Sequence, residues 1–115
     1  MSPGANRRLT NPMIKMNHDS IEKMRANASA AENLLKSLAN ANRLMVLCHL
    51  VSGELSVGEL ERLVGLSQSS LSQHLARLRQ QKILSCRKEG TTVYYSLSDE
   101  NAASILQQLH VIYCQ

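Results

Sequence analysis

The chain has 115 residues, which is enough for one domain, and its composition favours helices. It contains no Phe, no Trp and only three Tyr, so a core has to be built from Leu, Ile, Val, Met and Ala. Thirteen Lys and Arg against nine Asp and Glu give a net charge of +4, which suits a polyanionic partner and is equally compatible with simple solubility.

The sequence lacks the features of exported and membrane proteins. No run approaches the ~20 apolar residues of a membrane span, and the N-terminus lacks the charged and then apolar pattern of a signal peptide. We therefore expect a cytoplasmic protein with no membrane partner. Three Cys is an odd number in a reducing compartment, which argues against a disulfide framework and leaves inert, metal-binding or redox-active thiols.

The beginning of the chain differs from the rest. It carries both prolines and no sustained hydrophobic periodicity. We expect residues 1–17 to be a flexible N-terminal leader and residues 18–115 to form the folded domain. Arg7 and Arg8 could touch DNA phosphates nonspecifically, although a leader without a function is the simpler interpretation.

A helical pattern runs from Ser20 to about Leu38. Small Ala side chains on its apolar side allow another helix to approach closely, so we expect this helix to pack on a partner subunit as well as on its own core. The apolar positions are Ile21, Met24, Ala28, Ala31, Leu34, Leu35 and Leu38.

The next predicted helix extends from Ala41 to about Val51, with Asn40 as its N-cap and Gly53 placed to end it. It is apolar almost all round, which is typical of a central helix. Cys48 lies within it, and a small buried hydrophobe is the ordinary role of such a cysteine.

A strand-like entry and a short helix are predicted between Leu55 and Leu66, and Ser56 with Glu59 has the spacing of a capping box. Gly65 then allows a tight turn into another helix, which is the helix-turn-helix layout. The expected inward-facing residues of the short helix are Val57, Leu60, Leu63 and Val64.

The stretch 66–82 follows this turn, with Ser67 as the expected N-cap. Leucines recur at helical spacing on one face and predict docking on a core. The opposite face carries short, amide and guanidinium side chains that can bond to base edges in a DNA major groove, with a merely solvated helix as the alternative. The leucines are Leu71, Leu75 and Leu78, and the candidate DNA contacts are Gln68, Ser69, Ser70, Ser72, Gln73, His74 and Arg77.

Two β-prone runs, 83–87 and 93–97, flank a Gly-containing turn and predict a hairpin. A basic hairpin after such a helix is a wing that can reach a phosphate or the adjacent minor groove, although plain turn chemistry would give the same residues. The candidate contacts are Arg87, Lys88 and Thr91.

A last helix is expected from Asn101 to about Tyr113, capped by the segment 98–100. It is too apolar to stand alone. With the first long helix it could form a two-fold interface that places two copies of the 66–82 helix about one DNA turn (~34 Å) apart.

With these elements in this order, the chain resembles the ArsR/SmtB family of dimeric winged-helix repressors from about Leu34 to Cys114. The resemblance is carried by the segments 35–44, 53–60, 66–78 and 90–97. One departure is Ala41, where many members have proline. The resemblance implies a mainly α winged helix-turn-helix with a small β-hairpin, a homodimer through the first and last helices, binding to double-stranded operator DNA, and no enzymatic activity.

Family members differ in what they sense. Two metal-site patterns of the family are absent here, since residues 57–64 contain no Cys and the last helix has only His110. The chain is more similar to the BigR- and SqrR-like dithiol subgroup of sulfide- and persulfide-responsive repressors, whose paired cysteines match Cys48 and Cys114. That resemblance implies a Cys48–Cys114 disulfide or polysulfide bridge that forms with reactive sulfur species or oxidants and lowers operator affinity. Cys86 has no counterpart in the pair.

Two alternatives stay open. Cys48, Cys114 and His110 could be ligands of Zn²⁺ or Cu(I), since thiolate and imidazole suit either metal, although we expect no resident metal or cofactor. The other is a thiol enzyme or a protein-interaction module that uses the scaffold without DNA. Cys48 has apolar neighbours and no orienting carboxylate nearby in the sequence, which disfavours catalysis.

Overall fold

The computed structural model describes residues 15–114. Residues 1–14 and Gln115 lie outside the described residues, and with them most of the predicted leader, including Arg7 and Arg8. The chain divides into two compact units, residues 1–33 and residues 34–115.

The described part of the first unit is helical. α1 (His18–Leu38) begins two residues earlier than predicted and continues into the second unit. The Asn17 side chain accepts a hydrogen bond from the backbone N–H of Ser20, which satisfies one donor of the first turn. Between residues 15 and 33 no side chain is buried, and Ile21 and Met24 are exposed.

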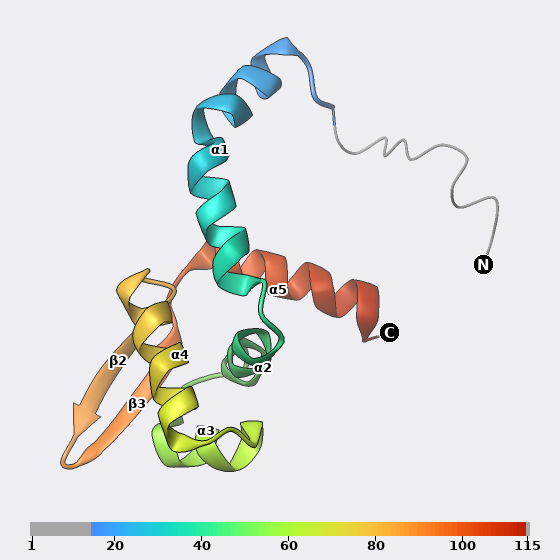
Figure 1. Cartoon of the computed structure of the whole chain (residues 1–115). Coiled ribbons are helices and arrows are strands. Elements are labelled where there is room, and N and C mark those ends of the chain that lie inside the picture. The colour runs from blue at the N-terminus through green and yellow to red at the C-terminus, as the bar shows by residue number, and fades with distance from the viewer. Residues whose placement is uncertain (1–14, 115) are drawn as a thin grey trace. The chain divides into compact units, whose positions relative to one another are not determined.

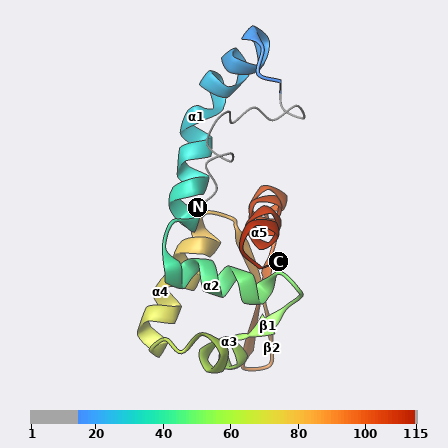
Figure 2. The same ribbon diagram turned by 90° about the vertical axis from the view of Figure 1, so that its right-hand side faces the viewer.

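The second unit combines helices with a small sheet that lies to one side of them (Figures 1 and 2). Its antiparallel sheet has the order β1-β3-β2, so β3 is central. The elements are α2 (Ala41–Leu50), β1 (Leu55–Ser56), α3 (Val57–Val64), α4 (Gln68–Gln80), β2 (Leu84–Glu89), β3 (Thr92–Leu97) and α5 (Glu100–Tyr113). This arrangement confirms the predicted mainly α winged helix-turn-helix with a β-hairpin.

One continuous core holds the second unit together. Every helix from α2 to α5 contributes at least one buried apolar side chain, as do the residues leading into β2. Burial of such side chains is the dominant favourable contribution to folding. The buried apolar residues are Leu38, Val46, Leu47, Leu50, Leu60, Leu71, Leu75, Leu78, Ile83, Leu84, Ala102 and Leu106.

Helix starts follow the predicted capping residues. The side chains of Asn40 and Ser67 accept backbone N–H groups at the starts of α2 and α4. Ser56 and Glu59 form both bonds of the predicted capping box. Gly65 has a φ of 69°, a left-handed conformation that suits glycine, and it ends α3 three residues before α4 begins.

The wing differs from its prediction in length. β2 continues through Glu89 and β3 starts at Thr92, so the turn is confined to Gly90 and Thr91. Lys88 and Glu89, which were expected in the turn, therefore lie within β2, and Arg87 lies inside the strand rather than at its end. β1 adds a third strand because Leu55 and Ser56 pair with β3.

Two burial predictions are wrong, those for Leu63 and Cys48. Leu63 in α3 is 51% exposed because, at about 100° per residue, Val57 and Val64 lie to one side of Leu60 and Leu63 lies to the other. Cys48 is exposed rather than buried. The end of α5 is uncovered in the single chain, where Tyr113 is 78% exposed.

Candidate nucleic-acid interface and thiol pair

α4 presents two faces of different character. Its three predicted leucines are buried at 0–2% exposure, so the helix is fixed on the core in the predicted rotation. The polar face points outward: most of its side chains are exposed, and Ser70 and His74 are half-buried. The exposed ones are Gln68, Ser69, Ser72, Gln73 and Arg77.

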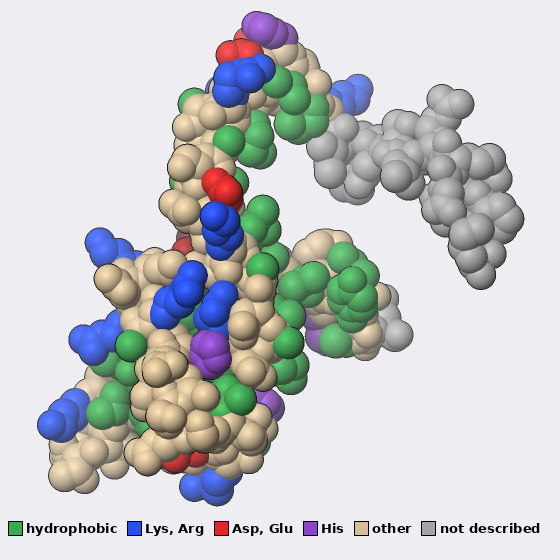
Figure 3. All heavy atoms as spheres, in the orientation of Figure 1, with side chains coloured by type: hydrophobic (Ala, Val, Ile, Leu, Met, Phe, Trp, Pro, Cys, Tyr) green, Lys and Arg blue, Asp and Glu red, His purple; other side chains and the backbone are tan. Residues whose placement is uncertain are grey.

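Basic side chains gather on the second unit in the region of α4, where Figure 3 shows a histidine beside two Lys or Arg side chains. His74 lies near the guanidinium groups of Arg43 and Arg77. Burial lowers the pKa of His74 below its ordinary value, and the two positive charges lower it further. His74 is therefore a neutral imidazole at pH 7, with one hydrogen-bond donor and one acceptor.

Arg43 of α2 binds the end of α1 through two hydrogen bonds. Its buried side chain donates from Nε to the backbone oxygen of Ser37 at 2.7 Å and from Nη2 to that of Lys36 at 2.9 Å. These carbonyls belong to the last turn of α1, where a helix has no internal donors left. The Ser37 hydroxyl in turn donates to the side-chain oxygen of Gln81, which caps α4. In the sequence, Arg43 is a single charged residue in an otherwise apolar helix, and no local pattern indicates that it binds the end of α1.

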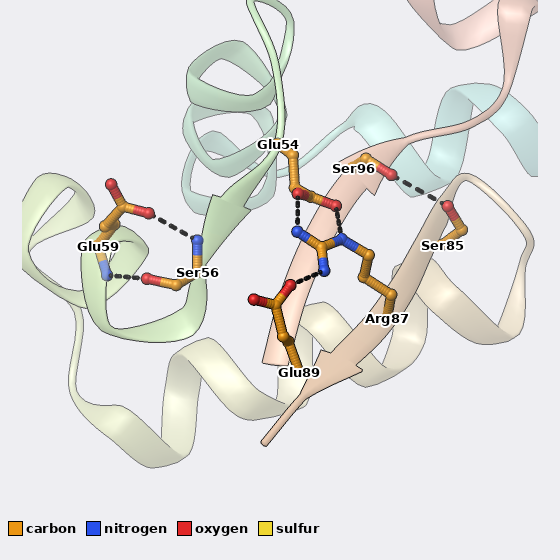
Figure 4. A network of polar contacts seen from close by, with 7 residues as sticks. All are labelled: Glu54, Ser56, Glu59, Ser85, Arg87, Glu89 and Ser96. Atoms are coloured by element: carbon orange, nitrogen blue, oxygen red, sulfur yellow. Dashed lines mark hydrogen bonds and ion pairs between the residues drawn. The ribbon is translucent and has the colours of Figure 1, made fainter. Parts of the chain in front are cut away.

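Arg87 in the wing is held by two carboxylates. Its Nε and Nη2 donate to the two oxygens of Glu54, each at 2.8 Å, and its Nη1 donates to Glu89 at 2.6 Å (Figure 4). The guanidinium carbon also lies 4.4 Å from the centre of the Tyr94 ring. The hydrogen bonds from Arg87 lower the pKa of Glu54. Sequence reasoning missed Glu54, because no local pattern shows which strand an acidic loop residue will meet.

The remaining wing candidates are less constrained in position. Lys88 and Thr91 are exposed, and Thr91 lies in the turn. Arg87 also retains donors, since a guanidinium carries five N–H groups and three are used in the bonds to Glu54 and Glu89.

The structure brings Cys48 and Cys114 close to each other, although they come from α2 and from the residue that caps α5. Both thiols are free and exposed. Neighbouring protein atoms partly shield the Cys48 thiol from water, which raises its pKa, and the negative charge of a Cys114 thiolate raises the pKa further. Figures 1 and 2 both show α5 lying beside α2. Cys86 lies elsewhere, half-buried on β2 and paired in register with Tyr95.

Two features of residues 15–114 bear on alternative functions. No group of three or more His, Cys, Asp or Glu side chains that could hold a metal ion occurs there. None of the helices in the same range is both long and apolar enough to span a membrane.

The structure has the four elements that define the winged helix-turn-helix class of DNA-binding proteins. They are a short helix, a tight glycine turn, a second helix with an outward polar face, and a β-hairpin. Residues 40–85 match the family described as bacterial regulatory protein, arsR family. The chain is 45% identical over 104 residues to the transcriptional activator HlyU of Vibrio cholerae, covering 90% of this chain and 96% of that protein. It is 41% identical over 97 residues to the biofilm growth-associated repressor of Xylella fastidiosa, covering 84% and 85%. The chain therefore belongs to the arsR family and is a DNA-binding transcriptional regulator.

Solved structures agree with this assignment. Reduced HlyU from Vibrio cholerae superposes with a TM-score of 0.77 at 48% identity, covering 82% of this chain and 99% of that one. The repressor BigR from Xylella fastidiosa gives 0.79 at 41% identity, covering 83% and 97%. A homodimeric winged helix-turn-helix domain from Mycobacterium bovis gives 0.68 at 27% identity, covering 79% and 84%. The family resemblance drawn from the sequence is confirmed.

Proposed function

We propose that the protein is a homodimeric repressor that binds double-stranded operator DNA and is released when Cys48 and Cys114 are bridged by reactive sulfur species or an oxidant. The observation that carries this proposal is the thiol pair itself. Two exposed cysteines from distant parts of the sequence lie close enough for the charge of one to raise the pKa of the other. One relative is named a repressor and another an activator, so repression is part of the proposal.

DNA contact is assigned to α4 and the wing. The outward polar face of α4 can enter a major groove while its leucines stay on the core, and the exposed wing can reach the backbone beside it. The proposed contacts are Gln68, Ser69, Ser70, Ser72, Gln73, His74, Arg77, Arg87, Lys88 and Thr91.

A second copy of the chain is the proposed cover for the exposed apolar side chains. α5 exposes Val111, Ile112 and Tyr113, and α1 separately exposes Ile21 and Met24. Burying such surface stabilises association, and a symmetric dimer would present two α4 helices to successive DNA turns. The homodimeric neighbour supports this assembly.

The proposed chemistry needs only a persulfide, RSSH, as the oxidant. A cysteine thiolate attacks the outer sulfur of RSSH, becomes a cysteine persulfide and releases the thiol RSH after protonation. The second thiolate attacks the inner sulfur of that persulfide, expels hydrosulfide and closes the disulfide. If a second RSSH first converts the second cysteine to a persulfide, the terminal sulfur of that persulfide makes the same attack, expels hydrosulfide and leaves a trisulfide. This bridge spans more than the ~4.4–6.8 Å between the Cα atoms of an ordinary disulfide.

The bridge would act on DNA binding through α2. This helix carries Cys48 on its exposed side and buries Val46, Leu47 and Leu50 in the core shared with α4. Fixing α2 to the end of α5 therefore constrains the element on which α4 rests. Because an operator fixes the separation of its half-sites, a small change in the separation of two α4 helices weakens binding.

The test uses the duplex that the wild-type protein selects most tightly from a random 30-base-pair pool. The affinity of the protein for this duplex is measured before and after the protein is treated with glutathione persulfide. The intact mass of the protein shows whether the bridge has formed. We expect weaker binding by the wild type and by Cys86→Ser, and an unchanged affinity for Cys48→Ser and Cys114→Ser. A bridged wild-type protein that binds as tightly as the reduced one would refute sulfur sensing, and failure to select any duplex would refute the DNA-binding assignment.

A further inference from the structure

Arg87 reaches across the three-stranded sheet. It lies on the edge strand β2, where its register partner is Tyr94 on the central strand β3. Tyr94 is also paired with Ser56 on β1, the opposite edge strand. The Arg87 guanidinium lies over the Tyr94 ring and meets Glu54, two residues before Ser56 (Figure 4). One side chain thus connects the wing to the segment between α2 and β1.

The third strand of the sheet supports the wing only near Tyr94 and Tyr95. β1 pairs with β3 at two positions, which are opposite Tyr94 and Tyr95. Beyond them an open cleft separates the wing turn from the start of α3, with Thr91 and Thr92 on one side and Val57 and Gly58 on the other. The bonds from Arg87 to Glu54 are thus a side-chain connection between the hairpin and the segment before β1, next to the point where the pairing of β1 ends.

The geometry of the pair suits positioning. Two parallel N–H···O bonds between a guanidinium and a carboxylate fix the orientation of both groups, which a lysine ammonium cannot do. The Arg87 side chain is 49% exposed and that of Glu54 is 34% exposed, so the pair contributes little to the stability of the fold. An acidic side chain in contact with the wing also repels DNA phosphates, so electrostatic attraction to DNA cannot explain Glu54.

We propose that Glu54 and Arg87 form a clamp that positions the wing, so that tight binding to the selected duplex depends on an acidic residue. The same clamp links the wing to α2, which ends at Leu50, shortly before Glu54. A displacement of α2 caused by bridging Cys48 then reaches the wing through Glu54. This second part rests on the proposed function.

The first experiment compares the full-length wild type with Glu54→Gln, Arg87→Lys, the double variant and Glu89→Gln on the selected duplex and on a scrambled one. Glu54→Gln and Arg87→Lys should each weaken binding to the selected duplex about tenfold and leave binding to the scrambled duplex unchanged or stronger, because positive charge is kept. The double variant should be no weaker than either single one. Glu89→Gln is the matched control, since Glu89 contacts the same guanidinium from the same strand, and it should change binding less than twofold.

Thermal unfolding separates positioning from folding, since half-exposed pairs of this kind shift the midpoint by at most about 5 °C. Tighter binding of Glu54→Gln to both duplexes would show that Glu54 acts only by repulsion and would overturn the clamp. Full affinity in Arg87→Lys would also overturn it, because a point charge on a phosphate would then be sufficient.

The link to the thiols is tested on persulfide-treated protein. We expect the fold-loss of affinity on bridging to be several times smaller in Glu54→Gln than in the wild type. An equal fold-loss in both proteins would overturn the link to α2 and leave the wing-positioning role intact. Absence of any loss in the wild type would overturn sulfur sensing together with the link, whereas the comparison of reduced variants would still decide the clamp.

Discussion

Partial shielding from water raises the pKa of the Cys48 thiol on α2, and a thiolate at Cys114, which caps α5, raises it further. Two free cysteines therefore lie near each other, one on the central helix and one at the end of the terminal helix. Cys48 lies on the opposite side of α2 from the core that supports α4. That placement allows chemistry at the surface to change the support of the proposed DNA-reading helix.

The coupling between the thiols can be measured directly. Replacing Cys114 by Ser removes the neighbouring negative charge, so the pKa of Cys48 should fall part of the way towards its ordinary value. The fall is partial because the shielding from water, the larger cause, remains. The measurement is the pH dependence of Cys48 alkylation by iodoacetamide in a Cys86→Ser background. A pKa of Cys48 that is unchanged or higher in Cys114→Ser would contradict the coupling.

Substitutions on α4 should distinguish residues that contact bases from residues that contact phosphates. Gln73→Ala is expected to cost about 1–3 kcal/mol of discrimination between the selected duplex and a scrambled one, as for a lost amide contact to a base. Arg77→Ala, if its guanidinium contacts a phosphate, should weaken binding to both duplexes and reduce the salt slope by about one. Titrations at several salt concentrations measure both effects. Equal losses on both duplexes for Gln73→Ala would remove it from the reading face.

His74 should make the fold less stable in mild acid. Its pKa is lowered in the folded protein, whereas the unfolded chain has the ordinary value of 6.5. Below that pH the unfolded chain binds more protons, so stability falls as the pH falls from about 6.5 towards the lowered pKa. Denaturant unfolding at pH 7.5 and pH 5.5 should show a smaller loss in His74→Gln than in the wild type. Identical losses would mean that His74 titrates alike in both states.

Arg43 should matter for stability more than its polarity suggests. Arg43→Met keeps much of the volume but leaves the carbonyls of Ser37 and Lys36 without the charged donor that they have here. Hydrogen bonds to a charged group are worth about 1.5–3 kcal/mol, and we expect a loss of that order in the free energy of unfolding. Arg43→Lys should recover part of it, because an ammonium cannot bond both carbonyls in the same geometry. A loss below about 0.5 kcal/mol would show that water replaces the guanidinium.

A substitution in the core gives a reference value for these losses in the free energy of unfolding. Leu60→Ala in α3 removes a fully buried side chain and should cost about 2–5 kcal/mol, whereas Leu63→Ala on the same helix should cost far less because Leu63 is 51% exposed. Chemical denaturation of both variants measures the difference. Comparable losses would mean that Leu63 is buried in solution, as it would be if a partner subunit covered it.

The sequence by itself determined the order of the elements, the caps of the helices, the rotation of α4 on the core and the two cysteines of interest. These features depend on neighbours within a few residues or on one family pattern, so local periodicity and spacing are sufficient to find them. Only the tertiary structure decided that Arg43 binds the end of α1, that Arg87 crosses the sheet to Glu54, and that Cys48 is exposed beside Cys114. Each of those contacts joins residues from different elements, and their pairing depends on how the elements pack, which the pattern within a single element does not contain.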